Sequence, residues 1–188
     1  MTTSTRADEP LLRILAISGS LRARSSNTSL LQLATEIAPG DMGILMYDGL
    51  ASLPHFNPDD DVDVPPKTVR DLRSLVGAAH GLLFCSPEYA HGVPGSLKNA
   101  LDWLVASVEL PHKPVALLNA SPWATHAQAS LVETLTVMST HIVHEACATI
   151  PVARGDVAAD GTIESAEIRS SLFAALDAFR RGIRATTA

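Results

Sequence analysis

The sequence predicts an α/β fold, a three-layer sandwich in which a five-stranded parallel sheet of order 2-1-3-4-5 has helices on both faces. Two observations predict it. Short apolar runs alternate with longer amphipathic segments along the chain, which is typical of strands joined by crossover helices. Four of the five runs are apolar at nearly every position, as strands are when both faces of a sheet are covered. A chain of this length suits such a doubly wound sheet.

The expected strands are short and separated by helical patterns. The first is a nearly continuous apolar run, and the second follows the stop signal Pro39-Gly40. The third and fourth are apolar throughout, whereas the fifth has an imperfect pattern. The five ranges are 11–17, 42–47, 81–85, 115–118 and 142–150.

The expected helices carry apolar side chains at helical spacing. The first begins after Asn27, and the second is opened by Pro65-Pro66. In the third, the apolar stripe runs from Leu97 to Val108, and Lys98 and Asp102 are spaced to form an ion pair. The helices end near Pro39 and at 79, 108, 138 and 184, and a long surface loop is expected over 48–66.

Composition and charge narrow the classes of function. The chain has 188 residues, and we expect one domain over 11–188 after a flexible tail over 1–10. A net charge of −6 disfavours a nucleic-acid partner. No apolar run approaches the roughly 20 residues that span a bilayer, and no secretory signal is visible. Cys85 and Cys147 lie among apolar residues, as buried free thiols do in a reducing compartment, so we expect a cytoplasmic protein with no membrane partner.

The most polar segment of the chain, 18–27, directly follows the first strand and leads into a helix. The N-terminus of a helix offers free N–H groups and a positive dipole end, which favours a phosphate site. Either Arg22 or Arg24 adds a charged donor. The alternative is an ordinary helix cap, which needs only one Ser or Asn. This segment has more small donors than a cap needs: Ser18, Ser20, Ser25, Ser26 and Asn27.

A second irregular segment, 87–95, follows the third strand. Its two prolines and two glycines leave N–H groups free to face a planar ring, against which Tyr89 can pack. Glu88 can bond a polar edge of that ring. A half-buried Tyr89 and a solvated Glu88 are equally good interpretations of this segment alone. In a sheet of order 2-1-3-4-5, the switch point lies between strands one and three, so we expect the two polar segments side by side.

Three motifs stand out in the sequence: Gly19-Ser-Leu-Arg-x-x-Ser-x-Asn27, Leu53-Pro-x-Phe-Asn-Pro-Asp59 and Ser86-Pro-Glu-Tyr-x-x-x-Val-Pro-Gly-Ser-Leu-Lys-Asn-Ala-Leu-Asp-Trp103. Together they resemble the NADPH-dependent FMN reductase family of flavodoxin-like quinone and chromate reductases. The resemblance implies a flavodoxin-like fold with non-covalently bound FMN. It implies that the FMN phosphate is held by Ser20, Arg22, Ser25 and Asn27, near the Ser26 amide. It also implies that the flavin ring is lined by Pro87, Glu88, Tyr89, Ala90 and His91.

The resemblance also implies an activity. Hydride would pass from NAD(P)H to FMN and then, in ping-pong fashion, to a quinone-like, metal-oxyanion or flavin acceptor. Because the chemistry would take place at flavin N5, no catalytic residue is expected. Members of the family commonly form dimers or tetramers, so we expect a homodimer or homotetramer. The alternative is a flavodoxin-like electron carrier that binds FMN without turning over NAD(P)H, although aromatic residues make up only 4% of this chain.

One segment departs from the family pattern. After the fourth strand the family has a glycine-rich turn, whereas this chain has Ala120-Ser-Pro-Trp-Ala-Thr-His126. We expect Ser121 to reach the flavin, and Trp123 to narrow the pocket or pack on a neighbouring subunit. No metal site is expected, because His141 and His144 would point to opposite faces of a strand. Cys85 has no evident base nearby and is expected to be a core thiol.

Overall fold

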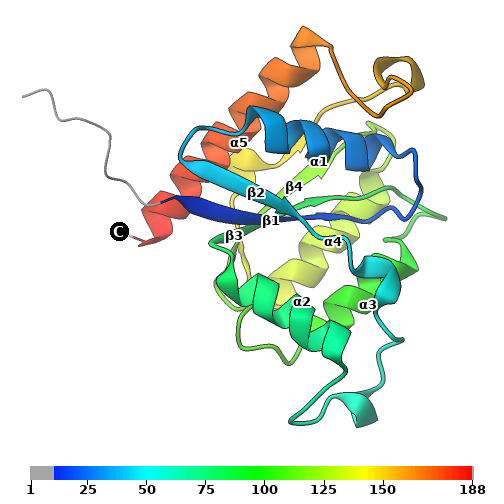
Figure 1. Ribbon diagram of the computed structural model, residues 1–188, viewed down its shortest axis with the longest axis vertical. Coiled ribbons are helices and arrows are strands. Elements are labelled where there is room, and N and C mark those ends of the chain that lie inside the picture. Colours follow the sequence, from blue (N-terminus) through cyan, green and yellow to red (C-terminus); the bar gives the residue numbers. More distant parts are fainter. Residues whose placement is uncertain (1–10, 188) are drawn as a thin grey trace, which may run out of the picture.

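The computed structural model describes residues 11–187, so the flexible tail expected over 1–10 lies outside the described residues. One parallel sheet has the order β2-β1-β3-β4-β5, and a further short strand, β6, also pairs with β4 (Figure 1). The predicted order 2-1-3-4-5 is confirmed. The strands are β1 (Leu12–Ser18), β2 (Met42–Met46), β3 (Gly81–Cys85), β4 (Pro114–Asn119), β5 (His141–Ile142) and β6 (Ala148–Thr149).

The fifth strand is not continuous over 142–150 as expected. A 3₁₀ helix over His144–Ala146 separates β5 from β6. On β4, Pro114 pairs with His141 and Leu118 pairs with Ala148. The segment from His141 to Ala148 therefore has three more residues than the segment of β4 from Pro114 to Leu118 that it pairs with. These residues cannot all pair with β4, and they loop out as the helical turn, which accounts for the imperfect pattern in the sequence.

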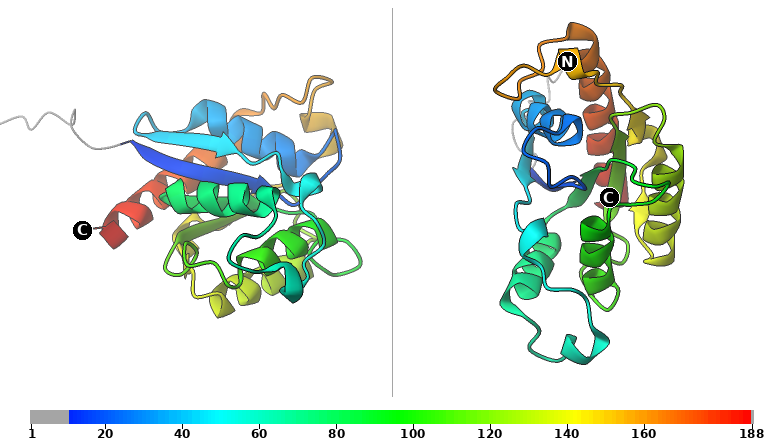
Figure 2. Two further views of the ribbon diagram at one scale, coloured as in Figure 1. Left: turned by 60° about the horizontal axis from the view of Figure 1, so that its bottom comes forward. Right: turned by 90° about the vertical axis from the view of Figure 1, so that its right-hand side faces the viewer.

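Five helices cover the two faces of the sheet (Figures 1 and 2). Helices α1 and α5 pack on one face, and α2, α3 and α4 pack on the other. Within β1, Ile14 and Ala16 face the first pair, while Leu15 and Ile17 face the other three helices. No helix of residues 11–187 is both long and apolar enough to cross a membrane. The helices are α1 (Ser26–Ile37), α2 (Lys67–Ala78), α3 (Gly95–Leu104), α4 (Thr125–Val137) and α5 (Ala166–Thr187).

Helix α3 is shorter than its expected apolar stripe. The amides of Val105 and Ser107 bond to carbonyls only three residues back, which tightens the chain and ends the helix at Leu104. The expectation that the stripe extends to Val108 is therefore wrong, because Val105 and Val108 are exposed. The predicted ion pair is confirmed, with 2.5 Å between Lys98 Nζ and Asp102 Oδ1.

The long loop over 48–66 is held against α2 and α3. Trp103 of α3 is fully buried, and its ring meets that of Phe56 edge-on with centroids 5.0 Å apart. The Trp103 indole N–H donates to the Pro54 carbonyl at 2.8 Å. Arg73 of α2 donates to both carboxylate oxygens of Asp61, at 2.9 and 3.0 Å. These contacts give the loop a fixed course without regular strands or long helices.

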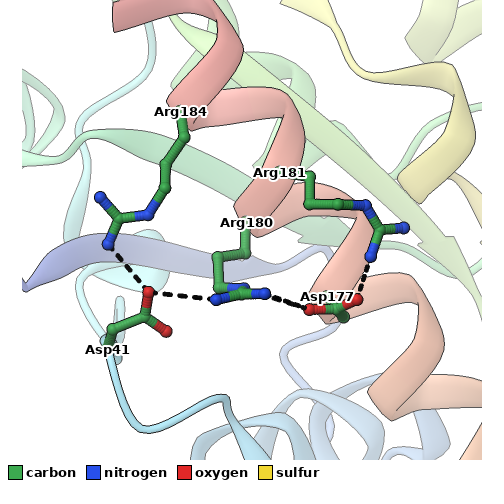
Figure 3. A network of polar contacts seen from close by, with 5 residues as sticks. All are labelled: Asp41, Asp177, Arg180, Arg181 and Arg184. Atoms are coloured by element: carbon green, nitrogen blue, oxygen red, sulfur yellow. Dashed lines mark hydrogen bonds and ion pairs between the residues drawn. The ribbon is translucent and has the colours of Figure 1, made fainter. Parts of the chain in front are cut away.

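Ion pairs connect the C-terminal helix to the residue just before β2 (Figure 3). Asp41 accepts hydrogen bonds from Arg180 at 3.3 Å and from Arg184 at 2.8 Å. Asp177 accepts from Arg180 at 2.8 Å and also contacts Arg181. Partial burial alone would raise the pKa of Asp41, but the two guanidiniums outweigh it and hold that pKa below its ordinary value. The ionised network therefore stabilises the packing of α5 beside the edge strand.

The register of the sheet places the polar segments next to each other. Ser18, the last residue of β1, pairs with Cys85, the last residue of β3. Cys85 in turn pairs with Leu118, near the end of β4. The turns after these three strands therefore leave the same edge of the sheet, at the switch point where doubly wound sheets bind their ligands.

Candidate active site

Hydroxyl groups shape the loop that follows β1. Ser18 Oγ shares a hydrogen bond with Thr28 Oγ1 at 2.8 Å and accepts one from the Ser20 amide at 3.2 Å. Ser20 Oγ accepts from the Arg22 amide at 3.3 Å. Ser25 is the N-cap of α1, and its hydroxyl accepts from the Thr28 amide at 3.4 Å. The capping interpretation thus applies to Ser25, while Ser18 and Ser20 are buried and fix the course of the loop.

Gly19 allows this loop to pack against the turn after β3. The Gly19 amide donates to the Cys85 carbonyl at 2.9 Å. A Cβ atom at Gly19 would lie 2.3 Å from Ser86 Oγ, 2.8 Å from Ser86 Cβ and 3.1 Å from Leu97. The missing side chain therefore brings the two polar turns into direct contact.

A cavity of about 430 Å³ opens beside the first turn of α1. Within residues 11–187, the three guanidiniums that line it have no hydrogen bond or ion pair to another side chain. Hydroxyls, guanidiniums and the first amides of a helix all donate, and this donor set fits a phosphate monoester such as that of FMN. The lining residues are Arg22, Arg24, Ser25, Ser26, Arg154 and Val157.

Asn27 differs from the other predicted phosphate ligands, because its side chain is engaged with β3. Its Oδ1 accepts a hydrogen bond from Cys85 Sγ at 3.2 Å. Burial raises the pKa of the Cys85 thiol to about 12. At neutral pH the thiol is therefore protonated and is no nucleophile, in agreement with the predicted core thiol. Cys147, expected to be buried, is only partly so.

The turn after β3 holds its backbone in a strained conformation. Tyr89 and Gly92 exchange two backbone hydrogen bonds, at 3.1 and 2.9 Å. Between them, Ala90 and His91 have φ angles of +49° and +59°, which non-glycine residues adopt only at a cost of about 1–3 kcal/mol. The amides of Ala90 and His91 make no hydrogen bond within the described part of the chain. Tyr89 is 50% exposed, so its ring lies open beside two free N–H groups.

Glu88 connects this turn to α4. Its Oε2 accepts from the Ala127 amide in the first turn of α4 at 2.8 Å, and its Oε1 lies 3.0 Å from His91 Nδ1. The Ala127 amide, together with the amide and ring of His126, holds the pKa of Glu88 below its ordinary value. The His91 and His126 rings meet edge-on, with their centroids 4.3 Å apart. Both oxygens of Glu88 are thus engaged within the protein. The contact of Glu88 with a flavin ring stays a prediction.

The turn after β4 completes the edge of the sheet. The Ser121 amide donates to Asn119 Oδ1 at 3.0 Å, and its hydroxyl accepts from the Trp123 amide at 3.3 Å. Ser121 therefore shapes its own turn in the absence of glycine. Trp123 is 85% exposed and packs into no pocket of the described chain.

The structure brings together more residues than the motifs indicate. Pro87 lies between Ser86, which contacts the first loop, and Glu88, which bonds to α4. Arg154 and Val157 join the cavity from the segment between β6 and α5, about 130 residues after Arg22. No motif surrounds Arg154, and the available signal is topological, since its segment follows a strand that ends at the same sheet edge.

Comparison with known proteins identifies the family. The profile of the NADPH-dependent FMN reductase family matches residues 12–157. The chain belongs to this family. An NAD(P)H-dependent FMN reductase of Pseudomonas aeruginosa is 33% identical over 178 residues, which cover 92% of this chain and 96% of that protein.

Two other similar proteins are a quinone reductase and a flavoenzyme. The quinone reductase of Escherichia coli is 35% identical over 106 residues, 56% of this chain and 55% of that enzyme. The solved structure of FerB, a flavoenzyme NAD(P)H:(acceptor) oxidoreductase from Paracoccus denitrificans, matches with a TM-score of 0.78 and 28% identity, covering 93% of this chain and 98% of FerB. The expected oxidoreductase of flavodoxin-like fold, with FMN as cofactor and NAD(P)H as reductant, is confirmed.

Proposed function

We propose that this FMN reductase passes electrons from NAD(P)H through bound FMN to a quinone-like, metal-oxyanion or flavin acceptor, in ping-pong fashion. One observation carries the proposal. The loop that borders an arginine-lined cavity and the turn with free amides are in direct contact at the switch point of the sheet. The residues proposed to form the FMN site, by direct contact or by holding its loops in place, are Ser18, Ser20, Arg22, Ser25, Ser26, Asn27, Pro87, Glu88, Tyr89, Ala90, His91 and Ser121.

At the phosphate end, we propose that Arg22, Ser25 and Ser26 contact FMN directly. They line the cavity beside the N-terminus of α1, where dipole and free amides favour an anion. Ser18 and Ser20 support the loop, since their hydroxyls are buried and bonded within it. Asn27 acts through its position at the first turn of α1, because its side-chain oxygen faces Cys85.

At the ring end, we propose that the Ala90 and His91 amides face the flavin. Both residues have left-handed backbone, and their amides donate no hydrogen bond within residues 11–187. Fixed N–H donors favour negative charge on a group beside them, and they are already oriented before that charge develops. The exposed Tyr89 ring lies in the same turn and can cover part of a planar ligand.

Bound FMN supplies the hydride and electron transfer itself. The chain is left to position its partners, and we assign no general acid or base. Glu88 is a positioning residue: its bonds to the Ala127 amide and to His91 hold the turn after β3 against α4. Ser121 has the corresponding task in the turn after β4.

The proposed acceptor class and assembly rest on separate observations. A quinone-like acceptor is supported by the similarity to the Escherichia coli quinone reductase. A homodimer or homotetramer is supported by exposed apolar side chains, with Trp123 at 85% and Val108 at 86% exposure. A cytoplasmic location is supported by the two free cysteines, Cys85 and Cys147.

Steady-state kinetics of the FMN-loaded protein tests this proposal. NADPH oxidation is measured at several concentrations of a soluble quinone. Ping-pong transfer gives parallel lines in a double-reciprocal plot. Intersecting lines would refute the ping-pong order. Tight FMN binding without NADPH oxidation would instead identify an electron carrier.

A further inference from the structure

Three arginines from two distant parts of the chain meet at the cavity beside α1. Arg22 and Arg24 lie in the loop after β1, and Arg154 lies in a 3₁₀ helix over Arg154–Asp156. In the left view of Figure 2, the segment that holds this 3₁₀ helix and the loop after β1 lie at the same end of the sheet. The FMN motif of the sequence accounts for Arg22, and it leaves Arg24 and Arg154 without an assigned role.

Within residues 11–187, no carboxylate forms an ion pair with the arginines of this cluster. The acids on the same segment as Arg154 are engaged in their own turns. Asp156 accepts from the Ala153 amide at 2.8 Å, and Asp160 accepts from the hydroxyl and amide of Thr162 at 2.8 and 3.0 Å. The guanidiniums therefore remain available to an anionic ligand.

One FMN phosphate does not balance the whole charge of this cluster. A phosphate monoester carries about −1.5 to −2 at neutral pH, whereas three guanidiniums carry three positive charges. Arg24 also lines a narrower cavity of about 100 Å³ against residues 157–161. Arg24 and Arg154 thus lie on the side of the cavity that is formed by the segment before α5.

The geometry points to a second anion subsite, made by Arg24 and Arg154, that takes a phosphate group of the nicotinamide dinucleotide. This inference rests on the proposed function, because it assumes that NAD(P)H is the reductant. The dinucleotide brings two kinds of phosphate: a pyrophosphate common to NADH and NADPH, and a 2′-phosphate found only in NADPH. Both are oxygen-rich anions that guanidiniums bind through charge-assisted, often bidentate hydrogen bonds.

The test is calorimetric titration of Arg24→Ala and Arg154→Ala proteins, loaded with FMN, with NADP⁺ and with NAD⁺. FMN affinity of each variant is measured separately by flavin fluorescence. We expect at least tenfold weaker NADP⁺ binding with FMN affinity changed less than threefold. Loss of affinity for NADP⁺ alone would show that the subsite binds the 2′-phosphate. Equal loss of affinity for both dinucleotides would show that it binds the pyrophosphate. Arg154→Lys should recover part of the affinity, and Arg70→Ala, on the exposed side of α2, is the matched control.

Other results would overturn the subsite. A tenfold loss of FMN affinity in Arg154→Ala with unchanged dinucleotide affinity would assign this arginine to the FMN phosphate. Unchanged affinity for both ligands would leave it without a binding role. Failure of the proposed function is distinguishable, because wild-type protein would then take up no FMN. Titration of that FMN-free protein with NADP⁺ would still measure the contribution of Arg154.

Discussion

Single residues decide whether the two polar turns can form one site. Arg22 contributes to the cavity beside α1 a guanidinium that has no side-chain partner among the described residues. Gly19 contributes the absence of a side chain, since a Cβ there would overlap Ser86. In one short loop, Arg22 thus supplies positive charge to the cavity, and Gly19, three positions earlier, allows the loop to approach the turn after β3 closely.

Arg22→Ala should weaken FMN binding at least tenfold. A hydrogen bond to a charged group is worth about 1.5–3 kcal/mol, and tenfold in affinity corresponds to about 1.4 kcal/mol. The dissociation constant is measured by quenching of flavin fluorescence, with Arg70→Ala as the control. Unchanged affinity in Arg22→Ala would remove this residue from the phosphate site.

Gly19→Ala should both destabilise the fold and weaken FMN binding. Overpacking of this kind costs about 1–3 kcal/mol, because the new methyl group would displace Ser86 and the turn after β3. Urea denaturation measures the free energy of unfolding. The control is Gly40→Ala, where no atom lies within 4 Å of the added Cβ. Equal stability of the two variants would be inconsistent with the described contact.

At the scale of elements, the turn after β3 and helix α4 are connected through Glu88. Its carboxylate accepts from the first turn of α4 and pairs with His91, and the left-handed conformation of Ala90 and His91 lies between these contacts and Gly92. A strained turn persists only where its surroundings hold it. The negative charge also lies at the positive end of the helix dipole.

Glu88→Gln should loosen this connection without unfolding the protein. We expect lower hydrogen-exchange protection at the Ala127 amide, with little change in Glu133→Gln, an exposed position on the same helix. The pKa of Glu88 is lowered from 4.5, so its contribution is present above that pH and lost as the pH falls through the lowered value. The wild type should therefore lose protection in acid. Equal protection in wild type and Glu88→Gln at neutral pH would contradict the assigned contact.

At the scale of the whole molecule, α5 closes the layer that α1 begins. The two helices share a core with β1, and Asp41 bonds to two arginines of α5 (Figure 3). The bonds to Asp41 hold α5 beside the start of β2 in this layer.

Asp41→Asn should lower the free energy of unfolding by about 1 kcal/mol, more than an exposed ion pair and less than a fully buried one. The pKa of Asp41 is lowered from 3.8, so this stabilisation is present above that pH and is lost as the pH falls through the folded-state value. Urea denaturation at neutral pH measures the difference, and Asp63→Asn, an exposed acid, is the control. Wild-type stability in Asp41→Asn would show that the network contributes nothing.

The sequence predicts best what depends on local pattern. The apolar runs locate β1 and β3 to within a residue, and the stop signals locate α1. The sequence predicts less well where strand pairing determines the structure. After Ile142, the extra residues between the paired positions cannot all pair with β4, so the expected single strand is interrupted. The sequence also misses Arg154, which reaches the cavity only through the topology of the sheet, and the hydrogen bond between Glu88 and the Ala127 amide, 39 residues further along the chain.

The most direct test of the central claim is the visible absorption spectrum of the purified protein after incubation with FMN and gel filtration. We expect a yellow protein whose flavin band bleaches on anaerobic addition of NADPH and returns when a soluble quinone is added. A colourless protein would contradict the FMN site formed by the two turns. A yellow protein that NADPH does not bleach would contradict the proposed oxidoreductase.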